Sequence, residues 1–363
     1  MMSYIKGKRI KHRGTFNNPH NRYHNQAHEE EFSDSQIRDA ASEDWQVTLT
    51  TEVQRESART IINYYDSPDI PGDRSINPYR GCEHGCVYCF ARPSHAYWDL
   101  SPGLDFETKL FQKENAVDLL VGELTKKRYK PRPIALGINT DAYQPIEKKY
   151  QLTRRILETL LACKHPVTLL TKSAVIERDI DLIEQLAKLN LVHVGISVTS
   201  LDMTLSRLME PRAAPPARRL LTIERLAKKG VPVNVMMAPI IPFINDAEIE
   251  TLLQTVKNAG ATHAAYVMIR LPHEIKELFS KWLNTHFPDR ANKVLNVIRD
   301  MHQGKLYKAK FGQRMTGSGQ YSELIQQRFT QAIKRVGLNK KGYRYLETKL
   351  FDAEVFNNQM RLF

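Results

Sequence analysis

The feature of this sequence that most restricts its fold is a repeated alternation of short apolar runs with amphipathic stretches between residues 75 and 269. Short apolar runs are typical of strands that are covered on both faces, and the stretches between them have the period of helices. The expected strands are 75–79, 133–139, 166–171, 192–198, 231–238 and 264–269. The expected helices are 114–128, 147–163, 174–189, 215–229 and 246–259.

Strands that alternate with helices in this way predict an α/β fold with a parallel sheet and right-handed crossovers. Six such units favour a partial (β/α)6 barrel of the TIM type. In barrels of this kind the chemistry gathers at the C-terminal ends of the strands. The residues that directly follow each expected strand are therefore the first candidates for a functional site.

The chain divides into three expected parts, of which residues 70–272 form the barrel. Residues 1–55 are basic, rich in histidine and without apolar periodicity, which predicts a partly disordered leader that either wraps the domain or grips a polyanion. Residues 273–363 predict a helical, basic C-terminal extension, which serves either as a solvated cap or as a nucleic-acid surface. Its expected helices are 273–286, 290–303 and 320–336, with a Gly-rich loop at 312–319.

The charge balance points to partners and to a cellular location. Lysine and arginine number 53 against 40 acidic residues, giving a net charge of +13, which suits nucleic acid as a partner and equally suits a basic enzyme. No apolar run approaches the roughly 18 residues of a membrane span, and the first residues lack the apolar core of a secretory signal. We therefore expect a cytoplasmic protein with no membrane partner.

Three of the four cysteines form a C-x3-C-x2-C triplet after the first expected strand, at Cys82, Cys86 and Cys89. Cysteines so close together do not make a disulfide framework, and reduced thiols at this spacing indicate a metal. A structural zinc would need a fourth ligand, for which His84 is available. A [4Fe–4S] cluster held by three cysteines would instead keep one iron without a protein ligand. Both interpretations remain open on spacing alone.

The C-x3-C-x-aromatic-C pattern, following the first strand of a predicted barrel, resembles the radical S-adenosylmethionine (radical SAM) superfamily. The resemblance implies that Cys82, Cys86 and Cys89 bind a [4Fe–4S] cluster and that Tyr88 lies near the cofactor. It further implies that SAM chelates the open iron and is cleaved reductively to a 5′-deoxyadenosyl radical, with electrons from a flavodoxin or ferredoxin. Only Cys163 remains, so a second all-cysteine cluster is excluded.

Polar residues at the strand ends resemble the spore photoproduct lyase branch of that superfamily. The run that ends the second strand is similar to the branch's T-S-D segment, and T-K-S at 171–173 also matches. The resemblance places these residues around SAM, with Arg219 on the SAM carboxylate. The residues carried over are Asn139, Thr140, Asp141, Lys172, Ser197, Arg219 and Met237.

Each of these residues also has a purely structural interpretation. Asp141 could cap the helix that follows, Lys172 and Arg219 could be solvated charges, and Met237 could be core packing. The chain departs from the lyases at Ile138, where they carry the cysteine that returns a hydrogen atom to the product radical. Repair of the spore thymine dimer by the same route is therefore not expected.

Three functions follow from the sequence. The first is a radical SAM enzyme of lyase or transferase type that acts on nucleic acid. The second is the same chemistry on a protein or a small metabolite. The third is a zinc-stabilised nucleic-acid-binding protein without catalysis. Catalytic residues, substrate and oligomeric state are unassigned by the sequence.

Overall fold

The computed structural model describes residues 13–23, 49–340, 342 and 345–359, and its centre is a seven-stranded sheet. The strand order is β10-β9-β8-β7-β6-β3-β2, in which all neighbours are parallel except the antiparallel pair β2 and β3. The expected partial barrel of the α/β class is confirmed. The strands are β2 (Ile62–Tyr64), β3 (Arg74–Ile76), β6 (Ile134–Leu136), β7 (Val167–Thr171), β8 (Val192–Ser197), β9 (Val233–Ile240) and β10 (His263–Met268).

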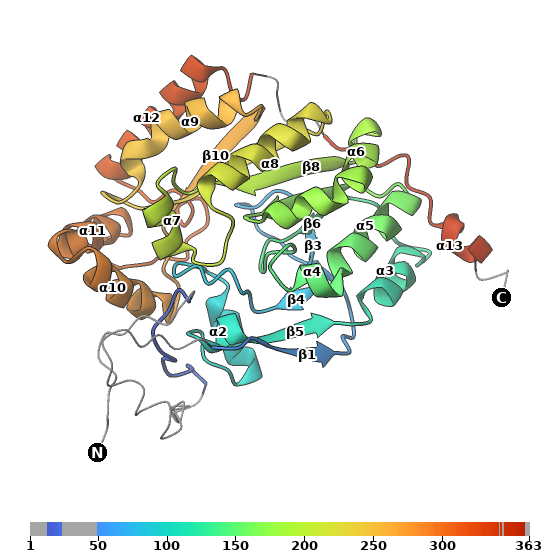
Figure 1. Cartoon of the computed structure of the whole chain (residues 1–363), viewed down its shortest axis with the longest axis horizontal. Helices are drawn as coiled ribbons and strands as arrows, with labels where there is room; N and C mark the ends of the chain where they lie inside the picture. Colours follow the sequence, from blue (N-terminus) through green and yellow to red (C-terminus); the bar gives the residue numbers. More distant parts are fainter. Residues whose placement is uncertain (1–12, 24–48, 341, 343–344, 360–363) are drawn as a thin grey trace.

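Amphipathic helices cover the outer face of this sheet (Figure 1). Side chains alternate along each strand, so Val235 and Met237 of β9 belong to the core that the helices share, while Met236 lies on the other face and is half-buried. The inner face is therefore the more open one. The covering helices are α3 (Ala116–Leu124), α5 (Leu152–Ala162), α6 (Ile180–Lys188), α8 (Pro216–Lys228) and α9 (Ile249–Asn258).

Two expected elements are divided in the structure. The helix expected at 147–163 is interrupted at Gln151, whose φ of 51° ends α4 (Glu147–Tyr150) before α5 begins. The buried Glu147 carboxylate accepts a bond from Thr153 N at 3.1 Å, which satisfies the start of α5. Short 3-10 turns, η2 (Ala174–Asp179) and η3 (Asp246–Glu248), likewise precede α6 and α9.

A second, three-stranded sheet was not predicted. Its order is β1 (Glu52–Glu56), β5 (Lys109–Lys113) and β4 (Tyr79–Arg80), and β1 falls within the expected leader. The first expected strand, 75–79, is therefore divided between the two sheets. Its first residues belong to β3 of the barrel, and Tyr79 belongs to β4 of the second sheet. The second sheet lies beside the barrel next to α2 (Asp105–Thr108), and η1 (Arg92–Trp98) joins β4 to that helix (Figure 1).

The C-terminal extension is helical, as expected, and packs on the barrel. It contains α10 (Ile275–His286), α11 (Pro288–Met301), α12 (Gln320–Val336) and α13 (Glu354–Gln359). The Gly-rich loop contacts both edges of the open sheet. At one edge, Met268 N of β10 donates to Met315 O at 2.8 Å. At the other edge, Arg314 forms an ion pair at 2.5 Å with Asp69, which follows β2. No helix in the described part of the chain is long and apolar enough to cross a membrane.

Candidate cluster and cofactor site

The cysteine loop lies between β4 and η1, at the C-terminal end of the barrel strands. Two glycines with positive φ, Gly81 at 71° and Gly85 at 67°, allow it to turn tightly. A Cβ on Gly85 would lie 2.8 Å from a Glu107 carboxylate oxygen, so the loop closes directly onto its support. Cys82 and Cys86 are buried and Cys89 is half-buried.

A buried ion pair supports this loop from behind. Arg92 and Glu107 have no exposed side-chain surface and their charged groups lie 2.5 Å apart. Arg92 also donates to the carbonyl oxygens of Cys86 and Gly103, each at 2.8 Å. The position of the Cys86 backbone therefore depends on a guanidinium that the ion pair fixes in place.

Residues 13–23, which we name the N-terminal strap, cover the same support. Gly14 N and Thr15 Oγ1 donate to the two carboxylate oxygens of Glu107 at 3.0 and 3.1 Å. A Cβ on Gly14 would lie 1.6 Å from the Gly85 carbonyl oxygen, so the two backbones are in direct contact. This part of the expected leader is thus folded against the cysteine loop, and residues 1–12 and 24–48 lie outside the described residues.

Gln144 fixes the loop from the barrel side. Its side chain is fully buried, donates to Gly81 O at 3.0 Å and accepts from Glu83 N at 2.9 Å. Sequence reasoning did not assign Gln144 a role, although it stands three residues after Asp141 at the same strand exit. Its residue type gives no indication of a contact made 63 positions away.

Burial controls the protonation of the cysteines. It raises the pKa of Cys86 to about 12 and, together with Asp141, Cys86 and Cys89, raises the pKa of Cys82 well above its usual value. Cysteine binds iron as the thiolate, so loading of the loop with iron must release protons.

The donor set fits a [4Fe–4S] cluster better than a single zinc ion. Three thiols on one loop can serve separate corners of a cluster. In the described part of the chain, no three His, Cys, Asp or Glu side chains are placed to hold one metal ion. His84 is also engaged elsewhere, because its Nε2 lies 3.1 Å from Asp141 Oδ2. The arrangement therefore does not support the zinc site of three cysteines and His84.

Asp141 connects two strand ends to the cysteine loop. Its carboxylate accepts from the Thr171 hydroxyl at 2.7 Å and from Lys172 N at 2.8 Å, and it faces His84. Burial alone would raise the pKa of Asp141, but His84 and these donors outweigh it and lower the pKa to about 2. Protein groups thus already surround the carboxylate that the resemblance places beside SAM.

The two residues before Asp141 follow a similar pattern. The Thr140 hydroxyl donates to Tyr79 O at 2.9 Å, and the Asn77 side chain accepts from Asn139 N at 3.1 Å. The turn is closed by Gly137, at φ 87°, where a Cβ would lie 2.3 Å from a β7 carbonyl oxygen. The side chain of Asn139 lines a cavity.

Two other strand-end donors have no partner among the residues that the structure describes. Ser197 Oγ is buried and has no hydrogen-bond partner among the described residues. Lys172 is half-buried, its Nζ lies 6.0 Å from the centroid of the Tyr88 ring, and the structure gives it no ion pair within the described ranges. Burial alone would lower the pKa of Lys172, but Cys86 and Glu210 raise it. Ser197 and Lys172 are therefore a donor and a cation without acceptors among those residues.

Arg219 is fully engaged by the protein. Its guanidinium donates to Ala214 O at 2.6 Å and Ser197 O at 2.9 Å and forms a buried ion pair with Glu210. Glu210 also accepts from the Thr199 hydroxyl at 2.8 Å and from the Tyr88 hydroxyl. These bonds join the cysteine loop to β8 and α8. Glu210 belongs to the Met-Glu-Pro-Arg run at 209–212, but sequence reasoning gave it no role of its own.

Met237, the last residue expected at the cofactor, lies on the face of the sheet opposite to Met236 and to the open inner face. Its side chain is fully buried in the core that the sheet shares with the covering helices. Met236, one position earlier, lies on the inner face of β9 beside Ser197 of β8.

Comparisons with known proteins agree with this geometry. The family model of the radical SAM superfamily matches residues 76–256. An uncharacterized protein of Mycobacterium tuberculosis is 34% identical over 63% of this chain and 68% of its own length. An uncharacterized protein of Methanocaldococcus jannaschii is 31% identical over 54% of this chain and 71% of its own length.

Solved structures show the same fold. A spore photoproduct lyase variant with bound AdoMet and dinucleoside spore photoproduct aligns over 78% of this chain and 79% of its own, with a TM-score of 0.57. The sequence identity is 14%. A second variant of the lyase, solved as a Tyr-to-Phe mutant, has the same TM-score and coverage. At this identity the likeness concerns the fold alone.

Proposed function

This chain belongs to the radical SAM superfamily, and on that premise we propose that it is an enzyme that binds a [4Fe–4S] cluster through Cys82, Cys86 and Cys89 and cleaves SAM reductively. The observation that carries the proposal is the compact loop of three buried or half-buried thiols, together with Lys172 and Ser197 at the ends of β7 and β8, whose donor groups have no acceptor among the described residues. The cluster and SAM, when bound, supply one-electron cleavage of the S–C5′ bond, which gives methionine and a 5′-deoxyadenosyl radical.

We assign the SAM carboxylate to Lys172 and Ser197. A cation and an orphaned hydroxyl on adjacent strand ends offer the charge and the hydrogen bond that a carboxylate accepts. An unmade bond at a buried hydroxyl costs about 1–3 kcal/mol, so a ligand that completes it is favoured. Asn139 and Thr140 follow the neighbouring strand β6, beside Asp141, which bonds to Lys172 N.

Arg219 takes a positioning role in this proposal. Its guanidinium is already bonded to Glu210 and to the Ser197 backbone, so it fixes Ser197 and, through Glu210, the Tyr88 ring over the cysteine loop. Asp141 acts in the same way on Lys172, whose backbone N–H it binds at 2.8 Å. Arg219 and Asp141 thus position the side chains that bind SAM and need not contact SAM themselves.

The partners remain part of the proposal. Reductive cleavage needs a one-electron donor, which we take to be a flavodoxin or a ferredoxin. We take nucleic acid as the first candidate substrate, which the net charge of +13 suits, with a protein or a small metabolite as the alternatives. If the protein contacts six phosphate groups, its affinity for nucleic acid should fall by about a thousandfold or more when the salt concentration rises from 50 to 200 mM. Binding without a salt dependence would favour the alternative substrates.

The deciding experiment is SAM cleavage by the anaerobically reconstituted chain. We expect 5′-deoxyadenosine after reduction with dithionite, and none from Cys86→Ala. Cys163→Ala is the matched control, because that thiol is buried in the helix-side core; it should load iron and cleave SAM as the wild type does. A colourless protein that holds one zinc and makes no 5′-deoxyadenosine would overturn the proposal.

A further inference from the structure

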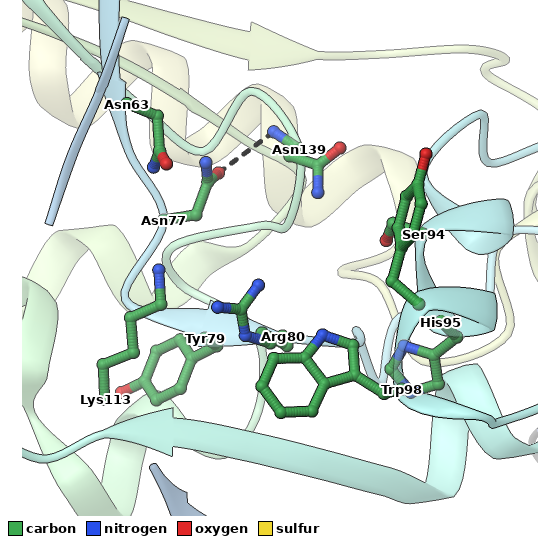
Figure 2. Close-up of a pocket in the computed structure, with 10 residues that line it drawn as sticks. Asn63, Asn77, Tyr79, Arg80, Ser94, His95, Trp98, Lys113 and Asn139 are labelled. Atoms are coloured by element: carbon green, nitrogen blue, oxygen red, sulfur yellow. Dashed lines mark hydrogen bonds between the residues drawn. The ribbon is translucent and has the colours of Figure 1, made fainter. Parts of the chain in front are cut away.

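A cavity of about 520 Å³ opens beside the candidate cofactor site. Its lining comes from both sheets and from η1, and includes Lys113, Arg80, Trp98 and three asparagines (Figure 2). Asn139 belongs to both places, since it lines the cavity and stands two residues before Asp141. The cavity therefore reaches from the strand end at Asn139 to Trp98 of η1.

Lys113 carries the argument about charge. Its side chain is only 4% exposed, and the structure gives it no ion pair or side-chain hydrogen bond within the described ranges. The amine points toward the cavity, on the same side as the Arg80 guanidinium (Figure 2). A buried cation without a counter-charge destabilises a fold, and it is tolerated where an anion completes it.

Arg80 is held in a fixed position on the same side of the cavity as Lys113 (Figure 2). Its Nε and Nη2 donate to the two Glu56 carboxylate oxygens at 2.6 and 2.7 Å. Its Cζ lies 4.5 Å from the centroid of the Trp98 ring. Glu56 offsets one of the two cations, so the set of Lys113, Arg80 and Glu56 keeps one positive charge facing the cavity.

Planar and amide groups complete the lining. Trp98 keeps 41% of its surface exposed, although the Arg80 guanidinium and the Phe111 ring, whose centroid lies 5.2 Å away, already contact the indole, so a stacking partner meets the part of the ring that stays exposed. Asn77 uses its Oδ1 to accept from Asn139 N at 3.1 Å, which leaves its amide N–H groups toward the cavity. Amide side chains next to an open aromatic ring can bind the edge of a ring that stacks there.

We propose that this cavity binds a nucleotide unit, with its phosphate on Lys113 and Arg80, its base on Trp98 and its polar edge on Asn77 and Asn139. A free nucleotide and one unit of a nucleic-acid strand share this chemistry. The inference deepens the proposed function and rests on it in one step. Because the cavity adjoins the proposed cofactor residues, we take its ligand to be part of the substrate.

The test measures binding to the full-length, cluster-loaded chain without reductant, with excess SAM so that the cofactor site is filled. Cytidine 5′-monophosphate, cytidine, inorganic phosphate and tetracytidylate are titrated by calorimetry. We expect the monophosphate to bind at least about tenfold more tightly than cytidine or phosphate alone, a difference of about 1.4 kcal/mol. Tighter binding of tetracytidylate identifies a strand as the ligand, and equal binding identifies the free nucleotide.

Two variants and a control assign the binding to the cavity. Lys113→Met should remove the preference for the monophosphate over cytidine, and Trp98→Ala should weaken both while keeping that preference. Lys127→Met removes an exposed lysine outside the cavity and should change neither. Equal binding of monophosphate and cytidine, or binding that Lys113→Met and Trp98→Ala leave unchanged, overturns the inference.

Failure of this inference is separable from failure of the proposed function. The titrations involve no SAM cleavage, so loss of 5′-deoxyadenosine formation with intact nucleotide binding would reject only the radical chemistry. Normal 5′-deoxyadenosine formation without nucleotide binding would reject only the cavity's ligand.

Discussion

Replacing Arg92 with methionine removes the central support of the cysteine loop. The substitution keeps most of the side-chain length but deletes the bonds to the Cys86 and Gly103 carbonyl oxygens and the ion pair with Glu107. Because both partners of this pair have no exposed side-chain surface, Glu107 is left as a buried charge whose remaining donors are Gly14 and Thr15. Breaking a buried pair in this way costs about 3–5 kcal/mol.

An exposed ion pair provides the matched control. Arg55 and Glu114 lie 3.7 Å apart with 77% and 47% of their side-chain surfaces exposed. Such pairs contribute about 0–1 kcal/mol, because water and salt screen them. Arg55→Met therefore makes the same chemical change in the same chain, and we expect it to leave the cysteine loop as stable as in the wild type.

Thiol labelling of the native, metal-free protein measures the effect at the loop itself. A loss of about 3 kcal/mol in local stability raises the population of opened loop by about two orders of magnitude, and labelling of Cys86 should accelerate accordingly. Cys163, buried in the helix-side core, is the internal reference. Unchanged labelling of Cys86 in Arg92→Met, or equal acceleration at Cys163, would refute the reasoning.

Three further predictions concern stability. Gly14→Ala places a Cβ 1.6 Å from the Gly85 carbonyl oxygen and should cost about 1–3 kcal/mol, seen as faster labelling of the cysteine loop; wild-type labelling would contradict the strap contact. Glu210→Gln leaves Arg219 buried without its counter-charge and should cost about 3–5 kcal/mol in urea unfolding, whereas a cost below about 1 kcal/mol would show that the pair is dispensable. Burial holds the pKa of Lys113 at about 8, below its usual 10.5. Between pH 8 and 10.5 the unfolded chain therefore binds a proton at Lys113 that the folded chain does not. The unfolding free energy of the wild type should therefore rise relative to Lys113→Met from pH 8 to 10.5, by about 3 kcal/mol, and a difference that is flat with pH would refute the burial effect.

The parts of the fold that the sequence predicted are those with a local pattern. The barrel strands agree with their apolar runs to within a few residues, because the face that each strand turns toward the helices is buried and apolar. The second sheet has no comparable apolar pattern in the sequence, because β4 has only two residues and β1 lies in a polar segment. Its pairing of β1 with β5 joins residues 57 positions apart, as in Glu52 and Lys109.

The candidate site was predictable where a spacing motif or a position directly after a strand indicates the chemistry. The C-x3-C-x2-C triplet was found from its residues, but Gln144, Arg92 and Glu107 are ordinary polar residues until the fold buries them. Met237 has the same strand parity as Val233 and Val235, so its side chain turns toward the helices, whereas Met236 shares its parity with the polar Asn234.

The N-terminal strap sets the boundaries of the folding unit. The family match begins at residue 76, yet one wall of the cysteine loop is built from residues 13–15 through contacts that span more than 90 positions of chain. Contacts between such distant residues form late, because the intervening chain must first be ordered. The strap is thus expected to dock late, and a fragment cut at the start of the family match would have its cysteine loop open to solvent on that side.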